Sequence, residues 1–541
     1  MALLPSLHRK TFSVAFVLLY MLAARGFAQP TRADAPALQA VFGNRTPYRY
    51  LIPRERADTA MDEFLYSVGE RYAIPLSLLQ DGEMRQLPDG SRVYRLAFQA
   101  PQAKFMDLSF TRFHLPKGGY AYLYNPGNGA YRGPYLPENI QDSLGFSTDL
   151  LQGDKVVLLC HAPTDSGDSV DIRLRRVIAG QKAFFNEEET PACLINTACE
   201  EAQAYTDIIH AVVLIYMDGY LCSGTVINNT ARDGTPYVLT AAHCMEELSY
   251  PNYGSWKFFF NIASNSCASN TDGPSLSDWD LQVMTGCQVV AKGKHSDFLL
   301  LKLNRKIPDS YRAFYSGWDR RNTPPENGVV GIHHPKGDYK KISFSGQKPI
   351  TDDCREIGFP RQAFWNFAWD RGMTFQGSSG SGLFERQRQR LVGTLTAIND
   401  VGCNSVTSNR LNWYGKLSYH WFANMETDPQ QQLRPWLDPI GTGTLCLDGS
   451  YFPNSPTGIR TPDSLQLKAY PNPVTDVLYL QSPEPLLSAE IISAQGSCLR
   501  RIAPCPTGKP IPLSDLPNGM YVLRVHSANQ VWHCKIALAH P

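Results

Sequence analysis

The chain has 541 residues, of which 43% are hydrophobic and 19% are charged, so most of it is expected to be globular rather than disordered. Its formal net charge is +1 and it has no long basic run, which gives a nucleic-acid-binding function no electrostatic basis. The 41 glycines, 39 prolines and 11% aromatic residues favour many short strands and turns, and the length allows roughly two to four domains.

The N-terminus has the pattern of an export signal. Positive residues at 8–10 precede an apolar run at 12–24, and the small residue Ala28 predicts cleavage before Gln29. The apolar run is too short to span a bilayer, which needs about 20 such residues, and no later segment qualifies. We therefore expect residues 1–28 to be removed and the remainder to carry no transmembrane anchor.

Residues 29–187 contain short runs of alternating apolar and polar residues. Examples are RVYRLAFQ at 92–99, YAYLYNP at 120–126 and DKVVLLC at 154–160. This alternation, bounded by Gly, Pro and Asn, predicts antiparallel strands. No catalytic set gathers here, so we expect a β-rich pro-region or a binding β-sandwich.

The number and spacing of the cysteines indicate how they are used. Thirteen cysteines in an exported protein indicate disulfides rather than a zinc site, because no pair has C-x-x-C spacing. The count is odd, so at least one thiol is free or pairs with another molecule. We expect no metal and no other cofactor.

Two motifs suggest a base and an acid. In YVLTAAHC, two alanines leave space around His243, and Cys244 follows directly. A lone histidine is usually a packing or surface residue, but in this setting we interpret His243 as a general base. In HSDFLLLKLN, Asp297 precedes an apolar strand, where its carboxylate needs hydrogen bonds such as an imidazole N–H can donate. An ordinary aspartate at a strand edge is the alternative.

The stretch TFQGSSGSGLFE at 374–385 lies between apolar runs, which is not the composition of a flexible linker. Gly377 and Gly380 bracket Ser379 and allow a sharp turn with close approach of a substrate backbone. A serine hydroxyl is a weak nucleophile until a base takes its proton, so Ser379 must meet His243 through folding. The N–H groups of Gly377 and Ser379 are candidates to stabilise a carbonyl oxygen that gains negative charge.

Together with CSGTVINNT, FYSGWDRR, GIHHPKGDYKKIS and LRPWLDPIGTG, these motifs resemble the trypsin-like serine proteases, and most closely the bacterial lysyl endopeptidases. The resemblance implies an all-β chain with a double β-barrel domain at 188–449. It also implies a secreted serine endopeptidase that cleaves proteins or peptides through an acyl-enzyme. His243 would be the base, Asp297 its orienting carboxylate and Ser379 the nucleophile. A catalytically silent surface adhesin on this scaffold and an esterase with the same triad are the alternatives.

The resemblance extends to disulfides and processing. It implies the pairs Cys193–Cys403, Cys199–Cys267 and Cys222–Cys244, the last of which would hold the turn that carries the histidine. Cys287 and Cys354 have no counterpart in the family, and a bond between them is one of two equal alternatives. By the same analogy the pro-region is cut within the polar segment 179–193, where Lys182 is one of several candidate positions.

The substrate pocket departs from the family pattern. The family's aspartate, nine residues after the cysteine matched to Cys403, corresponds to Asn412, and the pocket position of ordinary trypsins corresponds to Met373. A buried ammonium without a counter-ion is costly, so these residues do not predict strict specificity for lysine before the scissile bond (P1). A neutral P1 residue, or a relaxed Lys/Arg preference assisted by Asp400 or another loop acid, are the alternatives.

A linker at 450–464, rich in Pro, Ser, Thr and Gly, precedes a last domain at 465–541. Strands are predicted at 476–482, 487–493 and 519–527. The motifs AYPNPVTDVLYL, LPNGMYVLRV and CKIALA resemble the C-terminal sorting domain of the type IX secretion pathway of Bacteroidetes. This resemblance implies an Ig-like β-sandwich, the type IX machinery as partner, and export through the periplasm to the medium or the outer-membrane surface. A generic adhesive sandwich is the alternative.

Overall fold

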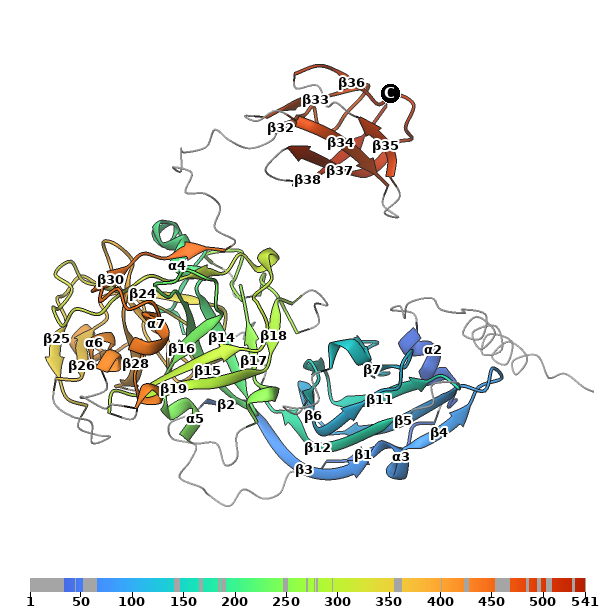
Figure 1. Cartoon of the computed structure of the whole chain (residues 1–541), viewed down its shortest axis with the longest axis horizontal. Coiled ribbons are helices and arrows are strands. Elements are labelled where there is room, and N and C mark those ends of the chain that lie inside the picture. The colour runs from blue at the N-terminus through green and yellow to red at the C-terminus, as the bar shows by residue number, and fades with distance from the viewer. Residues whose placement is uncertain are drawn as a thin grey trace, which may run out of the picture. The chain divides into compact units, whose positions relative to one another are not determined.

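The computed structural model describes residues 34–43, 45–51, 66–140, 146–164, 169–182, 185, 191–246, 252–268, 271–276, 278, 281–293, 295–354, 362–399, 401–422, 428–452, 468–482, 486–493, 498–502, 508–527 and 531–540. The predicted signal at 1–28 lies outside these residues. They are mostly β-strand with a few short helices, which confirms the all-β prediction (Figure 1). No described helix is both long enough and apolar enough to cross a membrane. The chain divides into two compact units, Met1–Asn454 and Ser455–Pro541.

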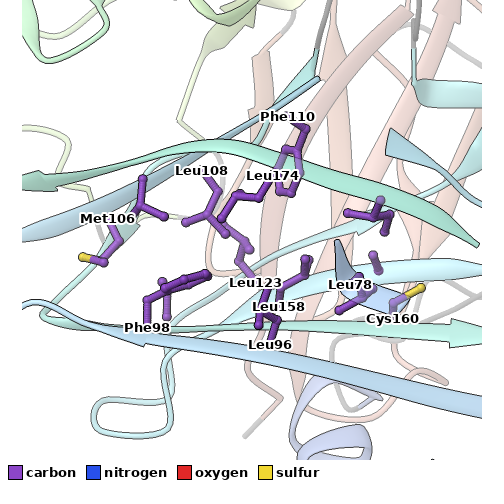
Figure 2. Packing of buried hydrophobic residues seen from close by; sticks show 14 of the residues in the cluster. Leu78, Leu96, Phe98, Met106, Leu108, Phe110, Leu123, Leu158, Cys160 and Leu174 are labelled. Carbon is purple, nitrogen blue, oxygen red and sulfur yellow. The ribbon is translucent and has the colours of Figure 1, made fainter. Parts of the chain in front are cut away.

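The first unit begins with a sandwich of two sheets, ordered β1-β5-β11-β7-β8 with β4 beside β5, and β10-β6-β12-β3 with β9 beside β6. The strands are β1 Arg49–Tyr50, β3 Gly69–Ser77, β4 Glu83–Gln86, β5 Arg92–Gln99, β6 Phe105–His114, β7 Tyr120–Tyr124, β8 Tyr131–Tyr135, β9 Phe146–Ser147, β10 Leu151–Gln152, β11 Lys155–Ala162 and β12 Asp171–Gly180. Alternate residues of each sheet point inward, so Leu96 and Leu158 pack with Leu108 and Leu174 (Figure 2). The predicted strands at 92–99, 120–126 and 154–160 are β5, β7 and β11.

Most of the rest of the first unit forms two larger sheets, as expected for a double β-barrel, and β21 Phe314–Tyr315 pairs with β31 Ser450–Tyr451 in a small additional sheet. The first has the order β18-β17-β14-β15-β16-β20-β19, with β2 beside β15. Its strands are β2 Tyr66–Ser67, β14 Val212–Met217, β15 Tyr220–Ile227, β16 Tyr237–Thr240, β17 Lys257–Phe259, β18 Val283–Thr285, β19 Cys287–Gly293 and β20 Phe298–Leu303. The antiparallel pairing of β16 with β20 places Thr240 opposite Leu299. His243 comes soon after the last residue of β16, and Asp297 precedes the first residue of β20. The pairing therefore places both residues at the same end of the sheet.

The second sheet has the order β13-β24-β23-β27-β28-β29-β26-β25, with β22 and β30 at its side. Its strands are β13 Ile195–Asn196, β22 Trp318–Asp319, β23 Val329–His333, β24 Lys341–Ser345, β25 Ile350–Asp352, β26 Phe364–Ala368, β27 Gly382–Glu385, β28 Leu391–Ile398, β29 Leu411–Lys416 and β30 Cys446–Leu447. Leu239 and Leu300 of the first sheet share one apolar cluster with Ile332 and Phe384 of the second. Burial of this cluster holds the two sheets together.

The second unit has the two-sheet arrangement expected of an Ig-like sandwich, with orders β32-β33-β36 and β35-β34-β37-β38. Its strands are β32 Lys468–Tyr470, β33 Val477–Gln481, β34 Leu486–Ile492, β35 Cys498–Ile502, β36 Ile511–Pro512, β37 Gly519–Ser527 and β38 Val531–Leu538. Tyr521, Leu523 and Val525 alternate along β37 and all three are buried in the core of this unit, as predicted.

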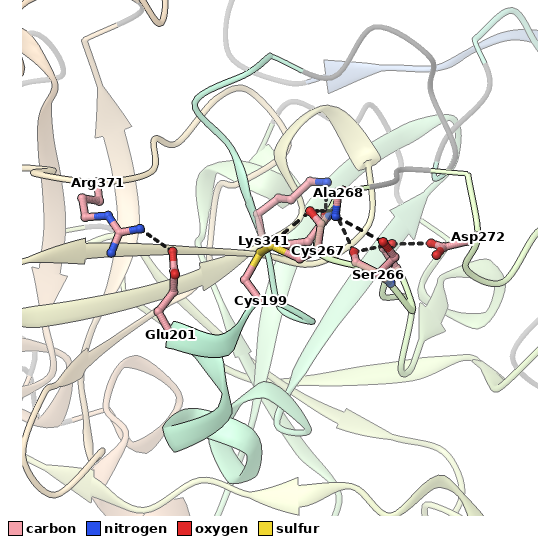
Figure 3. The surroundings of a disulfide bond; sticks show 10 residues. Cys199, Glu201, Ser266, Cys267, Ala268, Asp272, Lys341 and Arg371 are labelled. Atoms are coloured by element: carbon pink, nitrogen blue, oxygen red, sulfur yellow. Dashed lines mark hydrogen bonds and ion pairs between the residues drawn. A yellow bond between two sulfur atoms is a disulfide. The ribbon is translucent and has the colours of Figure 1, made fainter.

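The three disulfides implied by the family resemblance are present: Cys193–Cys403, Cys199–Cys267 and Cys222–Cys244. Figure 3 shows the surroundings of the second bond, with Lys341 close to Cys267. Asn196 donates from Nδ2 to the carbonyl oxygen of Cys267 at 3.2 Å and accepts from Lys341 Nζ at 2.6 Å.

The alternative in which Cys287 bonds to Cys354 is wrong. Cys287 is a free, buried thiol, and the two residues lie in separate apolar clusters. Sequence spacing carries no information about this separation, because a disulfide needs its two Cα atoms within about 7 Å in the folded chain.

Candidate active site

The carboxylate of Asp297 is bound to His243 through both of its oxygens. Oδ2 lies 2.7 Å from the imidazole Nδ1, and Oδ1 accepts from the backbone N–H of His243 at 2.8 Å. The carboxylate side chain is 2% exposed and the imidazole 17% exposed. A carboxylate this buried needs such donors, and its position favours the tautomer with the proton on Nδ1. In this tautomer Nε2 carries the lone pair and can accept a proton.

The turn that carries His243 is fixed to strand β15. The Cys222–Cys244 disulfide joins the residue after the histidine to this strand, and Thr240 donates from Oγ1 to the carbonyl oxygen of Ser223 at 2.8 Å. Asp297 itself has a φ of 59°, a left-handed conformation that is uncommon for residues other than glycine. The covalent and backbone restraints on both partners therefore hold the imidazole against the carboxylate.

The three serines of the GSSGSG stretch differ in accessibility. Ser378 and Ser381 are fully buried, whereas Ser379 between them is partly exposed. The hydroxyl of Ser378 is also within hydrogen-bond distance of His333 Nδ1, at 2.8 Å. Ser379 is thus the serine of this turn that a substrate can reach.

Both glycines beside Ser379 have conformations that L side chains rarely adopt, with φ of 87° at Gly377 and 77° at Gly380. A Cβ atom on Gly380 would lie 2.0 Å from Thr240 Oγ1 and 2.7 Å from the backbone nitrogen of Ala241. The carbonyl oxygen of Ser379 accepts from the N–H of Ser223 at 2.8 Å. The serine turn therefore packs directly against the segment that leads to His243.

The backbone of the turn leaves two donors available. The N–H groups of Ser378, Gly380 and Ser381 donate to carbonyl oxygens of the protein. Within the part of the chain that the structure describes, no acceptor is assigned to the N–H groups of Gly377 and Ser379. Two such donors beside a reactive hydroxyl are the chemical requirement for binding a developing oxyanion.

Two buried histidines that the sequence analysis did not identify form hydrogen bonds with the neighbours of Ser379 and Asp297. His333 on β23 contacts the Ser378 hydroxyl through Nδ1 and lies 3.1 Å from Ser343 Oγ through Nε2. Burial, with a smaller contribution from the nearby charge of Lys341, lowers the pKa of His333 to about 3. The imidazole is therefore neutral at physiological pH and acts as a hydrogen-bonding brace for the residue beside Ser379.

His420 contacts Ser296, the residue before Asp297. Its Nδ1 lies 2.8 Å from Ser296 Oγ, and its Nε2 lies 3.0 Å from Thr394 Oγ1. Burial lowers the pKa of His420 to about 3, although the charge of Asp297 opposes this shift. His333 ends an apolar strand and His420 lies in the short helix α6 Leu417–Phe422, positions that in sequence look like ordinary core positions. The HHP motif was the available signal for His333.

The two predicted pocket residues are connected through Thr374, which follows Met373 in the chain and donates a hydrogen bond to Asn412. Asn412 on β29 is 1% exposed, its Oδ1 accepts from the Thr374 hydroxyl, and its Nδ2 donates to the Arg410 carbonyl oxygen at 2.7 Å. Met373 is 2% exposed and precedes Thr374 in the chain. Neither side chain is charged, and both ends of the Asn412 amide are engaged by the protein. Asp400 lies outside the described residues.

Comparison with known proteins agrees with the motifs. Residues 188–415 match the family model described as lysyl endopeptidase, C-terminal domain. This part of the chain is similar to the lysyl endopeptidases. A lysyl endopeptidase of Pseudomonas aeruginosa is 30% identical over 206 residues, which are 36% of this chain and 41% of the relative. The chain thus spans about two fifths of the length of this curated relative.

Residues 468–539 match the family model described as secretion system C-terminal sorting domain. This confirms the predicted sorting domain and indicates export by the type IX system to the cell surface or the extracellular space. Among solved structures, two crystal structures of the inactive form of Rv3671c, a protease of M. tuberculosis, show weaker similarity. They have TM-scores of 0.28 and 0.26 at 14% and 13% identity, and the matches cover 42% and 40% of this chain and 93% and 84% of those chains.

The crowding at Gly380 generates the first prediction. We expect Gly380→Ala to lower the free energy of unfolding by about 2 kcal/mol or more, because the new methyl group collides with Thr240 in an already strained conformation. Gly402→Ala is the matched control, since nothing lies within 4 Å of the added atom. Thermal denaturation of both variants checks this, and equal melting temperatures would show that the turn is not packed as described.

Proposed function

We propose that the chain is a secreted serine endopeptidase of the lysyl endopeptidase type. The proposal depends mainly on one observation: the buried Asp297 is hydrogen-bonded to the partly exposed His243, beside a turn whose accessible serine is Ser379. The similarity of residues 188–415 to lysyl endopeptidases supports it. The proposed substrates are proteins and peptides.

In this mechanism His243 Nε2 takes the proton of the Ser379 hydroxyl as its oxygen attacks the peptide carbonyl carbon. Asp297 accepts a hydrogen bond from Nδ1 and stabilises the imidazolium that forms. The N–H groups of Gly377 and Ser379 bind the oxyanion of the tetrahedral intermediate, an interaction in which each donor contributes about 3 kcal/mol in comparable enzymes. His243 then gives the proton to the leaving amine, and water hydrolyses the acyl-enzyme by the same steps.

We further propose the domain division at 29–187 for the pro-region, 188–449 for the protease, 450–464 for the linker and 465–541 for the sorting domain. Lys182 is one candidate position for the activating cut. At Lys182 the backbone N–H donates to the Val68 carbonyl oxygen at 3.2 Å, and Nζ lies 4.4 Å from the centre of the Tyr66 ring. A cut at Lys182 therefore requires these contacts to open first.

A fluorophosphonate probe tests the proposed nucleophile. We expect the cleaved protein to be labelled on Ser379, as located by mass spectrometry of the labelled peptide, and Ser379→Ala to lose the label. Asp297→Asn should slow labelling by up to about 10⁴-fold, because the carboxamide favours the wrong imidazole tautomer. Folded, cleaved protein that takes up no label would favour a catalytically silent adhesin.

For the substrate pocket we propose that P1 specificity is not strictly for lysine, because Asn412 offers an engaged amide where the family has a carboxylate. We expect Asn412→Asp to raise the preference for P1 lysine over P1 glutamine by about 10- to 100-fold, equivalent to one charge-assisted hydrogen bond of about 1.5–3 kcal/mol. The measurement is kcat/KM on two peptides that differ only at P1. Asn412→Ala is the control, since it removes the amide without adding charge. An unchanged ratio in Asn412→Asp would mean that residue 412 does not line the pocket.

A further inference from the structure

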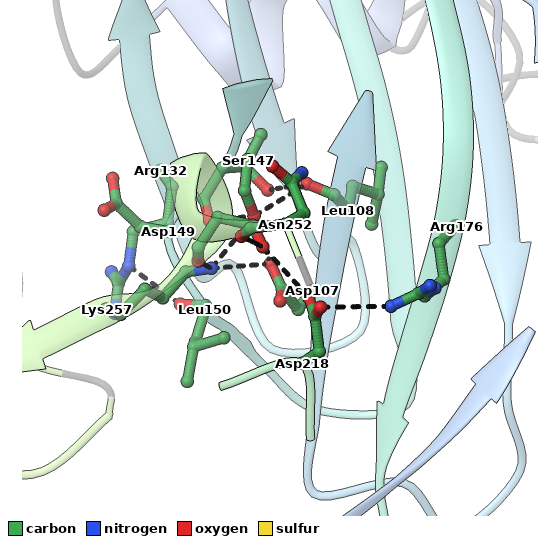
Figure 4. A network of polar contacts seen from close by, with 12 residues as sticks. Asp107, Leu108, Arg132, Ser147, Asp149, Leu150, Arg176, Asp218, Asn252 and Lys257 are labelled. Atoms are coloured by element: carbon green, nitrogen blue, oxygen red, sulfur yellow. Dashed lines mark hydrogen bonds and ion pairs between the residues drawn. The ribbon is translucent and has the colours of Figure 1, made fainter. Parts of the chain in front are cut away.

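The sandwich at the start of the first unit contacts a sheet of the proposed protease domain through a buried ion pair. This sheet, with the order β18-β17-β14-β15-β16-β20-β19, is called the protease sheet below. Lys257 on β17 is fully buried, and its Nζ lies 3.0 Å from Asp107 Oδ1 on β6 (Figure 4). The same ammonium donates to Ser147 Oγ at 2.9 Å and to the Ser255 carbonyl oxygen at 3.2 Å. Among the described residues, the one carboxylate within ion-pair distance of Lys257 is therefore supplied by the sandwich.

A second ion pair crosses the same boundary with the opposite polarity. Arg176 on β12 of the sandwich lies 3.2 Å from Asp218 in the turn between β14 and β15, measured from Nη1 to Oδ2. Asp218 also accepts from Ser255 Oγ at 2.9 Å. The two surfaces thus carry complementary charges, one cation and one carboxylate on each side, which fixes their relative register.

Apolar contacts and one strand pairing surround these charges. Phe105 and Ile178 of the sandwich pack in one buried cluster with Tyr216 and Phe259 of the protease sheet. Strand β2 pairs antiparallel with β15, and the N–H of Val68 donates to the Gly219 carbonyl oxygen at 2.8 Å. The boundary therefore has an apolar core, backbone hydrogen bonds and a desolvated charge pair, as a stable protein–protein interface does.

From this we infer that residues 66–182, once cut from the protease, remain docked on it as a separate subunit, and that the Lys257–Asp107 pair determines this recognition. The inference rests on the proposed pro-region. Departure of the sandwich would expose the apolar cluster to water, which favours the docked state. Within the docked state, substitution of only one partner of the buried pair leaves an uncompensated buried charge, which is far more costly than replacement of both partners by apolar groups.

The experiment uses the full chain with Ser379→Ala, to prevent self-digestion, and a recognition sequence for a specific protease substituted at 186–190. After the chain is cut, size-exclusion chromatography and dilution titration measure the dissociation constant of the two pieces. We expect them to co-elute at micromolar concentration. Asp107→Asn should raise the dissociation constant by about 100-fold or more, and Asp107→Leu with Lys257→Met should return it to within about 10-fold of the parent.

The matched control is Asp171→Asn, the same chemical change at a sandwich carboxylate whose ion-pair partners among the described residues are the exposed Arg112 and Arg173. It should leave the dissociation constant unchanged.

If Asp107→Asn fails to fold, the double variant decides: tight binding supports the inference and weak binding overturns it. Separation of the parent pieces, or equal effects of Asp107→Asn and Asp171→Asn, would also overturn it. Because the protein is inactive throughout, the result is independent of the fluorophosphonate test of function.

Discussion

A carboxylate buried at the start of a strand must be satisfied by hydrogen bonds, and Asp297 meets this demand with the side chain and the backbone of a single residue, His243. The pairing of β16 with β20 brings the two residues to the same end of the sheet. The Cys222–Cys244 disulfide and the His420–Ser296 contact then limit how far either can move. Without this pair, the imidazole would have neither a fixed tautomer nor a fixed direction.

The serine turn depends on both sheets of the candidate active site. Ser223 of the first sheet donates from its N–H to the Ser379 carbonyl oxygen and from its hydroxyl to the Gly377 carbonyl oxygen. His333 of the second sheet contacts Ser378 from the other side. Because these supports come from different sheets, the turn acquires its geometry only when the sheets have packed together. This coupling places the candidate nucleophile between the two sheets and links its geometry to their assembly.

Much of the architecture could be predicted from local pattern. Strands β16 and β20 were predicted beside His243 and Asp297 because apolar runs with turn residues at their ends have few other interpretations. The disulfides came from family resemblance alone, and the suggested Cys287–Cys354 bond failed because spacing does not report which apolar cluster a cysteine joins. The hydrogen-bonding roles of His333 and His420 likewise depend on partners far away in the sequence.

The Lys257–Asp107 pair could not be predicted from local sequence patterns. Lysine is almost never fully buried, so nothing in the local sequence around Lys257 indicates an interior position, and its partner lies 150 residues away. The family pattern suggested residue 412 as a pocket position, but it could not indicate that the amide of Asn412 is hydrogen-bonded to Thr374 and Arg410. Long-range polar contacts of this kind appear only once the fold is known.

The central claim is that one imidazole, one hydroxyl and two backbone N–H groups converge on a single reacting carbon. A crystal structure of the cleaved protein bound to a peptide boronate tests this most directly. The account predicts boron bonded to Ser379 Oγ, one boronate oxygen about 3 Å from the backbone nitrogens of Gly377 and Ser379, and His243 Nε2 within hydrogen-bond distance. Boron bonded to another residue, or a boronate oxygen that points away from both nitrogens, would contradict it.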